Sequence, residues 1–310
     1  MADDLSNMYE LVAGRLLSGK VVPVLGAGAN LGYRPPGAGY LQDVYLPSGS
    51  ELAEVLAKYV KYPEADVLDL ARVSQYVAAQ LGADGLYDEL HKIFDADYPP
   101  TRLHSFLARL ARHVRKAKTS ECMLLVTTNY DDALERAFRD EDEPYDLITY
   151  INEVECRGLF RHTPFGGEPS VIWEPNAYTD LPLDRTIIAK IHGAVGRHAG
   201  GPDSFVITED DYVDYITHAD IDRLFPATLA EKIKRSHFLF LGYSLRDWNV
   251  RVMLYRLRRE GTRRKSWAIE ANPDPVDRAT WDERGVDILH VRVENFVAAI
   301  EQRLPPPEAA

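Results

Sequence analysis

The sequence predicts an α/β fold: a Rossmann-like, mainly parallel sheet that is flanked by helices and interrupted by helical insertions. Two observations lead to this prediction. Short apolar runs rich in β-branched residues recur along the chain, and longer segments with helical spacing of apolar residues lie between them, which is typical of βαβ units. In addition, the glycine-rich stretch GAGAN directly follows the first apolar run, and open α/β sheets bind ligands at the carboxyl ends of their strands.

About six apolar runs are predicted to be strands, and an amphipathic helix precedes the first of them. The helix is indicated by apolar residues that recur at helical spacing, namely Leu5, Met8, Tyr9, Val12, Leu16 and Leu17. The predicted strands are VVPVL (21–25), MLLVT (123–127), TIIAKI (186–191), HFLFLG (237–242), SWAIE (266–270) and VDILHV (286–291).

The segment between the first two strands is too long for a single crossover and predicts a helical insertion over about residues 50–118. It opens with a capping box, because Ser48 is followed three residues later by Glu51 and then by apolar residues on one helical face. Further helical patterns cover residues 67–81 and 103–115.

Two later segments interrupt the predicted sheet. Residues from about 145 to 182 are rich in Pro, Gly and aromatic residues and lack a helical period, which predicts a loop or a small hairpin near the site. Residues from about 207 to 235 have helical periodicity. Residues 1–305 are therefore predicted to form a single domain, followed by a disordered tail at residues 306–310.

The composition restricts the possible partners and location. The 310 residues include 36 basic and 48 acidic side chains, a formal net charge of −12, so direct nucleic-acid binding is not expected. No apolar run approaches the roughly 20 residues that a membrane span requires, and the acidic N-terminus does not resemble a secretion signal. Cys122 and Cys156 are too few for a disulfide framework. We therefore expect a cytoplasmic protein without membrane contact.

Small or polar residues follow five of the predicted strands, at the edge where a ligand would bind. Each residue has an ordinary structural explanation as well: the glycines permit a tight turn, Asn129 or Asp131 caps the following helix, and His192 belongs to the core. These alternatives stay open for single residues, whereas their joint placement predicts a binding site. Its candidate residues are Gly26, Ala27, Gly28, Ala29, Asn30, Thr128, Asn129, Asp131, His192, Gly242, Ser244 and Asn272.

The glycine loop departs from the dinucleotide fingerprint of oxidoreductases. That fingerprint, G-x-G-x-x-G, needs a third glycine and an immediate helix. Here Leu31 occupies the third position, and a long loop over residues 32–50 follows. The backbone N–H groups of Gly26 and Gly28 are still expected to approach a pyrophosphate, and the long loop is predicted to be a lid over the bound molecule.

Taken together, these motifs resemble the sirtuin superfamily, and more closely its bacterial branch of NAD-consuming defence proteins. GAGAN resembles the family's G-A-G-x-S loop, TTNYD its T-Q-N-x-D, KIHG its H-G, and GYSL its G-T-S. Asn272 matches the asparagine that follows the next strand. The combination of TTNYDDALE with LGYSLRDWN is especially similar to the defence branch. The resemblance extends over about residues 21–272.

The sequence lacks two features of deacylating sirtuins. Their zinc module needs two C-x-x-C pairs, which Cys122 and Cys156 cannot supply, so no metal is expected. The segment AVGRHAGGPDSFVITEDDY follows the H-G motif in place of the F-G-E element beside which acyl-lysine peptides bind. Thr128 stands where the family has glutamine, and Asn30 where it has serine.

The resemblance implies an NAD+ glycohydrolase that cleaves NAD+ to nicotinamide and ADP-ribose as the NAD-depleting effector of a bacterial anti-phage, abortive-infection system. It implies that Asn129 orients the ribose hydroxyls and the attacking water, that His192 is the general base, and that the other candidate residues hold the nucleotide. Histidine suits this role because its ordinary pKa near 6.5 lets it accept a proton at neutral pH. NAD is then the substrate.

Two other functions stay open at this point: an NAD-dependent protein deacylase, and a non-catalytic sensor that binds NAD or ADP-ribose. Since unrestrained NAD hydrolysis is toxic, the resemblance also implies control by assembly. The implied assemblies are a homo-oligomer, or a complex with a partner such as a HerA-type ATPase or a short argonaute protein.

Overall fold

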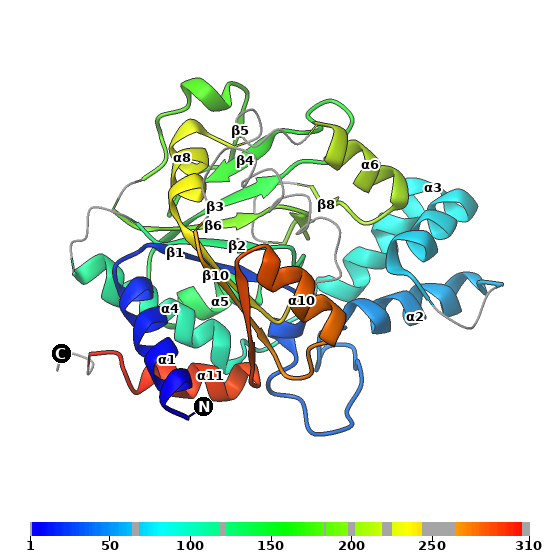
Figure 1. The fold of residues 1–310 in the computed structure, drawn as a ribbon. Coiled ribbons are helices and arrows are strands. Elements are labelled where there is room, and N and C mark those ends of the chain that lie inside the picture. The colour runs from blue at the N-terminus through cyan, green and yellow to red at the C-terminus, as the bar shows by residue number, and fades with distance from the viewer. Residues whose placement is uncertain are drawn as a thin grey trace.

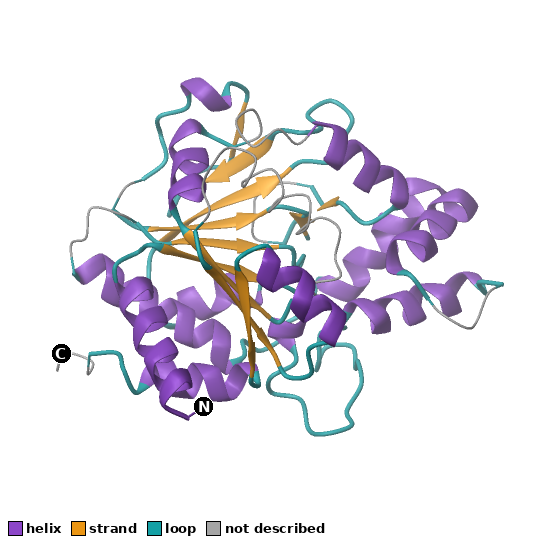
Figure 2. Cartoon of the chain, viewed as in Figure 1, coloured by secondary structure: helices purple, strands orange, loops and turns teal. Residues whose placement is uncertain are grey.

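A large sheet forms the centre of the protein. The computed structural model describes residues 2–63, 68–117, 122–182, 184–197, 202–218, 225–243 and 264–305. In this part of the chain the sheet has nine strands, in the order β11-β10-β9-β1-β2-β6-β3-β4-β5, and helices cover both of its faces (Figures 1 and 2). The strands are β1 (Val21–Leu25), β2 (Leu124–Thr127), β3 (Tyr145–Tyr150), β4 (Phe160–Thr163), β5 (Ser170–Ile172), β6 (Thr186–Lys190), β9 (His237–Leu241), β10 (Ser266–Glu270) and β11 (Val286–His290).

The α/β fold class predicted from the sequence is confirmed. All six predicted strands are present as β1, β2, β6, β9, β10 and β11, and they pair in parallel. In β1, Val22 and Val24 pack into the core on one face of the sheet, whereas Val21 and Leu25 pack into the core on the other. A strand between two helical layers buries both of its faces, which is why these strands appear in the sequence as unbroken apolar runs.

Residues 145–182, predicted as a loop or a small hairpin, contain three strands beyond the six predicted, and two of these, β4 and β5, form an antiparallel hairpin. β3 lies parallel to β6, and β4 and β5 continue the sheet as an antiparallel edge, so the sheet is mixed. These strands carry buried polar residues that interrupt any apolar run. Asp146 on β3 and His162 on β4 are both buried, and the carboxylate Oδ2 lies 2.7 Å from Nε2 of the imidazole.

Helices form a layer on each face of the sheet and a third group to one side. α1, α4, α5 and α11 share one apolar core with the sheet, and α8 and α10 contribute to the core on the opposite face. α2 and α3 pack together beside the sheet, as Figure 1 shows. The helices are α1 (Ala2–Leu17), α2 (Gly49–Val60), α3 (Leu70–Phe94), α4 (Arg102–Lys116), α5 (Ala133–Asp140), α6 (Glu209–His218), α8 (Ala227–Arg235), α10 (Pro275–Glu283) and α11 (Val293–Glu301).

The segment predicted as a helical insertion therefore divides into two parts. α4 belongs to the layer under the sheet, whereas α2 and α3 form the lateral group. The predicted capping box is present at the start of α2, where the N–H of Glu51 donates to Oγ of Ser48 (3.3 Å) and the N–H of Ser48 donates to Oε2 of Glu51 (2.8 Å). The lateral group packs against Tyr130, Val195 and Phe205, close to the strand ends.

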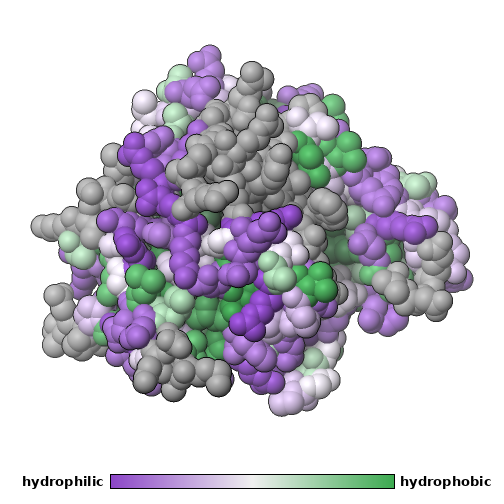
Figure 3. Space-filling view, viewed as in Figure 1, coloured by the Kyte–Doolittle hydropathy of each residue, from purple (hydrophilic) through white to green (hydrophobic). Residues whose placement is uncertain are grey.

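None of the helices in the described ranges is long and apolar enough to cross a bilayer, and on the face drawn in Figure 3 apolar residues form separate patches among hydrophilic ones. The candidate residue Ser244 and the predicted tail, residues 306–310, lie outside the described residues.

Candidate functional site

A cavity of about 890 Å³ lies at the carboxyl edge of the sheet. Its wall receives residues that follow β1, β2, β6 and β9 and the end of β10, and it is completed by the start of α2 and the start of α11. This volume is within the range of small-molecule sites, roughly 300–1,000 Å³. The candidate residues that the structure brings together on this wall are Gly26, Ala27, Gly28, Asn30, Thr128, Asn129, Asp131, His192 and Gly242.

Two other candidate residues are placed differently. Ala29 is buried behind the wall and is not among the residues that line the cavity. Asn272 is exposed to solvent and does not line the cavity, whereas its neighbours Glu270 and Ala271 do.

The glycine loop after β1 packs backbone against backbone on the end of β9. The N–H of Gly26 donates to the carbonyl of Leu241 (3.1 Å), and the N–H of Gly28 donates to the carbonyl of Gly242 (2.8 Å). A Cβ atom on Gly28 would lie 2.7 Å from that carbonyl oxygen, closer than real Cβ atoms approach. The glycines are therefore required by close packing, and the expectation that these two N–H groups face a pyrophosphate was wrong because the fold already uses them.

Asn30 and Asp131 connect the glycine loop to the turn after β2. Nδ2 of Asn30 donates to Oδ2 of Asp131 (2.8 Å), and both side chains are buried. Oδ1 of Asp131 accepts from the N–H of Ala133, the first residue of α5. The Asp131 carboxylate thus accepts hydrogen bonds from both the start of α5 and the glycine loop. Among the described residues, Oδ1 of Asn30 has no hydrogen-bond donor although the side chain lines the cavity.

Asn129 is fixed at both its backbone and its side chain. Its N–H donates to Oγ1 of Thr127 (3.0 Å), and its Nδ2 donates to the carbonyl of Gly26 (3.1 Å). Because an amide group has one NH2 and one carbonyl, the bond to Gly26 directs which end of the Asn129 side chain faces the glycine loop. The half-buried side chain lines the cavity.

His192 follows β6 and is almost fully buried, with 2% of its surface exposed. Its backbone carbonyl accepts from the N–H of Val206 (3.0 Å). The imidazole packs against the rings of Tyr212 and Tyr215 on α6, and both His192 and Tyr212 line the cavity.

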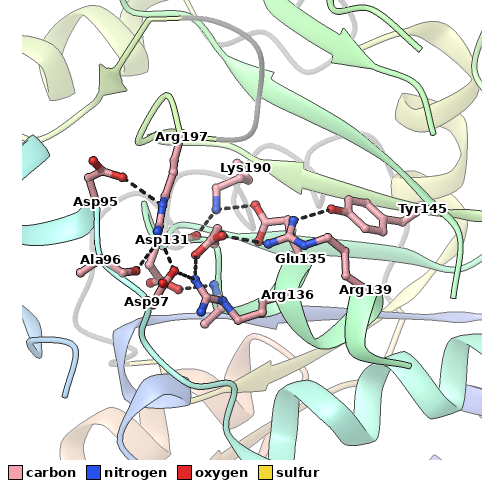
Figure 4. Close-up of polar contacts among 12 residues, drawn as sticks. Asp95, Ala96, Asp97, Asp131, Glu135, Arg136, Arg139, Tyr145, Lys190 and Arg197 are labelled. Carbon is pink, nitrogen blue, oxygen red and sulfur yellow. Dashed lines mark hydrogen bonds and ion pairs between the residues drawn. The ribbon is translucent and has the colours of Figure 1, made fainter. Parts of the chain in front are cut away.

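A buried ion pair that was not anticipated from the sequence lies beside the turn of Asp131 (Figure 4). Nζ of Lys190, at the end of β6, donates to the carbonyl of Asp131 and to Oε1 of Glu135 on α5, the latter at 2.9 Å. Burial raises the pKa of the Glu135 carboxyl, and the Lys190 ammonium opposes that rise. Lys190 thereby ties the turn that bears Asn129 to the strand that leads into His192. A lysine inside the apolar run TIIAKI was the available signal, since a buried ammonium needs a partner.

The residue before α4 hydrogen-bonds to the glycine loop. Oγ1 of Thr101 donates to the carbonyl of Ala29 (3.1 Å), and the N–H of Thr101 donates to Nδ1 of His104 (3.1 Å). Burial lowers the pKa of His104 to about 4, although the charge of Asp131 acts in the opposite direction. His104 is therefore neutral at pH 7, as its role as an acceptor requires.

The long loop predicted to be a lid is clamped by Glu51. Its carboxylate accepts from Nη1 of Arg34 (2.8 Å), from the N–H of Tyr40 (2.7 Å) and from the N–H of Ser48. Burial alone would raise the pKa of Glu51, but the hydrogen bonds from Arg34 and Ser48 lower it to about 2. Both ends of the loop reach the cavity, through Leu31 and through Pro47 and Ser48.

The described residues contain no group of three or more His, Cys, Asp and Glu side chains that could hold a metal ion. Neither Cys122 nor Cys156 takes part in a disulfide, and both are half-buried.

The mainly parallel sheet brings small and polar residues from several strand ends to one cavity. The protein is therefore an α/β protein with a candidate ligand site at the carboxyl edge of its sheet. The chain belongs to the SIR2-like domain family, whose model matches residues 123–289. The matched segment contains Asn129, Asp131 and His192 and begins after the glycine loop.

Three relatives are similar to this chain. Defense-associated sirtuin 2 of Bacillus subtilis is 23% identical over 74% of this chain and 19% of its own length. The NAD(+) hydrolase ThsA of Bacillus cereus (strain MSX-D12) is 25% identical over 78% of this chain and 44% of its own length. The NAD(+) hydrolase ThsA of Acinetobacter baumannii (strain 532279) is 27% identical over 63% of this chain and 32% of its own length. The chain thus spans less than half of each relative.

Proposed function

We propose that this protein is an NAD+ glycohydrolase, which cleaves NAD+ to nicotinamide and ADP-ribose as an effector of bacterial anti-phage defence. One observation carries the proposal: Asn129, Asp131 and His192 line the same cavity, of about 890 Å³, as the glycine loop. Membership of the SIR2-like family and relatives named NAD(+) hydrolase support NAD+ as the substrate.

The reaction breaks the bond between the ribose C1′ and the nicotinamide nitrogen, and positive charge develops on the ribose as in other glycosidic cleavages. In our proposal Asn129 orients the ribose hydroxyls and the water, and His192 takes the proton from that water. A positioned base of this kind contributes about 10² to 10⁴ in rate. Asn30, whose Oδ1 lacks a donor within the described residues, offers an acceptor to a ribose hydroxyl.

The nucleotide contacts follow the placement of the other candidate residues. Ala27, Thr128 and Gly242 line the cavity and are proposed to contact the substrate. Gly26 and Gly28 shape the wall through their packing on β9. Asn272 is exposed, so we do not include it among the proposed contacts.

Nicotinamide release from NAD+, followed by chromatography, tests the proposal. We expect Asn129→Ala and His192→Ala each to lower turnover by about 10² or more while the protein stays folded. Asn176→Ala and His290→Ala, which change the same residue types at exposed positions, serve as matched controls. Full activity in both site variants would refute the assignment, and tight NAD+ binding without turnover in the wild type would favour a sensor. Release of O-acyl-ADP-ribose that depends on an acylated peptide would favour a deacylase.

Control of the activity is part of the proposal. Because unrestrained hydrolysis would deplete cellular NAD+, we propose that a homo-oligomer or a partner protein restrains the enzyme. Measurement of the molecular mass alone and with proteins encoded beside it, together with turnover in each state, tests this. Equal turnover in every assembly state would exclude restraint by assembly.

A further inference from the structure

The imidazole of His192 packs against two aromatic rings of α6. The imidazole centroid lies 5.9 Å from the ring of Tyr212 and 5.5 Å from the ring of Tyr215, with interplanar angles of 67° and 82°. Tyr215 in turn packs against Tyr150 on β3 at 5.1 Å. These contacts are edge-on, the favourable arrangement for aromatic pairs.

The chain folds directly back over His192 to bring these rings into place. Gly193 has a φ of +84°, and a Cβ atom there would overlap the carbonyl of Ser204. This glycine allows the short hairpin of β7 (Gly193–Ala194) and β8 (Ser204–Phe205) to form immediately after His192. The hairpin leads to α6 (Figure 1), whose Tyr212 and Tyr215 pack against the imidazole.

The position of α6 is held by a dedicated set of hydrogen bonds. Asp211 accepts from the N–H groups of Ile207 (3.2 Å) and Thr208 (2.9 Å) through Oδ2. Its other oxygen accepts from Nδ2 of Asn152 (2.7 Å), just beyond β3. The helix that carries the two rings is thus anchored both to its own connection and to the sheet.

We propose that Tyr212 and Tyr215 select the acceptor of the reaction: by enclosing His192 they leave space for water beside the imidazole and exclude alcohols and acyl-lysine amides. This inference rests on the proposed NAD+ hydrolysis and adds the residues that decide which nucleophile is used.

The step that these rings control is a single displacement at C1′. The bond from C1′ to the nicotinamide nitrogen breaks, and its electron pair leaves on that nitrogen. A new bond forms between C1′ and the water oxygen, and the proton of that water passes to His192 and then to solvent. Methanol would react in the same way to give methyl ADP-ribose, so the ratio of the two products measures the selection.

Turnover of NAD+ in buffer containing methanol tests the proposal. We expect the wild type to form mostly ADP-ribose, because one added methyl group in an apolar pocket changes discrimination by roughly tenfold or more. Tyr212→Ala should raise the ratio of methyl ADP-ribose to ADP-ribose by roughly tenfold. Tyr212→Phe should keep the wild-type ratio, since it retains the ring. Tyr59→Ala, at a 48% exposed tyrosine of α2, is a control for the residue type.

Two results would overturn the proposal: a wild type that uses methanol as readily as water, or a Tyr212→Ala variant with an unchanged product ratio. Tyr215 is packed into the core, so Tyr215→Leu replaces Tyr215→Ala if the alanine variant fails to fold. With Tyr215→Leu we again expect an increased share of methyl ADP-ribose.

A second measurement keeps this inference separate from the proposed function. Carbethoxylation of histidines by diethyl pyrocarbonate reports access to the imidazole without any turnover. His192 should react more slowly than His91, whose side chain is 46% exposed, and Tyr212→Ala should accelerate only His192. If the wild type releases no nicotinamide, the proposed hydrolysis is refuted, but the labelling still tests whether the tyrosines shield His192. Equal rates of His192 carbethoxylation in the wild type and in Tyr212→Ala would show that they do not.

Discussion

The two walls of the cavity are held in place by different kinds of contact. The glycine-loop wall rests on β9 through backbone hydrogen bonds from Gly26 and Gly28, with no space for a side chain between the two segments. The second wall, with Asn129 and His192, rests on a buried ammonium that joins the carbonyl of Asp131 to a buried carboxylate (Figure 4).

This difference predicts which substitutions destabilise each wall. Contact between backbones is insensitive to pH but does not tolerate an added Cβ atom, because neither segment can retreat without losing its hydrogen bonds. A buried ion pair tolerates small changes of shape, but removal of one partner leaves an uncompensated charge. The hydrogen bond between Asn30 and Asp131 joins the two walls, so a substitution that disrupts one wall should also displace residues of the other.

The largest effect is expected from Gly242→Ala in the backbone-packed wall. Gly242 has a φ of +62°, and its Cβ atom would overlap the backbone N of Ala29. We expect a loss of about 5 kcal/mol or more, enough to prevent stable folding of many domains. Gly37→Ala is the matched control, since Gly37 also has a positive φ (+81°) but nothing within 4 Å of its Cβ position. It should cost only about 1 kcal/mol, and equal losses in urea unfolding would contradict the close-packing argument.

The next largest effect is expected from Lys190→Met in the ion-paired wall. Breaking a buried pair on one side typically costs about 3–5 kcal/mol. The double variant Lys190→Met/Glu135→Leu removes both charges and should recover most of the loss. Turnover should stay reduced in the double variant, because the carbonyl of Asp131 still lacks its donor. A double variant that is no more stable than Lys190→Met would show that the uncompensated charge of Glu135 is not the cause.

A pH effect of intermediate size is expected beneath the glycine loop, at His104. Its pKa is about 4 in the folded protein and about 6.5 when unfolded. The unfolded chain therefore binds the proton first, and stability falls as the pH decreases from 6.5 toward 4, by about 3 kcal/mol in total. His104→Gln preserves a capping box with Thr101 and removes the titration. Chemical unfolding of both proteins between pH 7 and 4 measures the difference, and parallel curves would exclude His104 as the source.

The comparison also explains what the sequence could predict. The glycine loop, Asn129 and His192 were found because each directly follows an apolar strand, and parallel strands deliver such residues to one edge. The contacts behind them could not be found in this way. Lys190 and Glu135 are 55 residues apart, and Thr101 and Ala29 are 72 apart, so their pairing depends on how the layers pack.

Side-chain direction and the strands β3 to β5 were also beyond the sequence pattern. Asn272 follows the correct strand, yet it points to solvent, because a strand end fixes where a residue lies and not which way its side chain turns. In β3 and β4 the buried pair of Asp146 and His162 replaces apolar residues, so hydrophobic periodicity gave no strand signal there.

The smallest effect is expected from Glu51→Gln, at the clamp of the long loop whose two ends line the cavity. The carboxylate holds Arg34, Tyr40 and Ser48, and its pKa of about 2 lies below the ordinary value of 4.5. Its contribution is therefore complete above pH 4.5 and is lost as the pH falls through 2. Because the pair with Arg34 is partly exposed to solvent, we expect a cost of only about 1 kcal/mol. The local effect should be larger: proteolysis within residues 31–48 should accelerate at pH 7 while global unfolding changes little. Equal cleavage rates in wild type and variant would mean that the loop is held by its other contacts and not by Glu51.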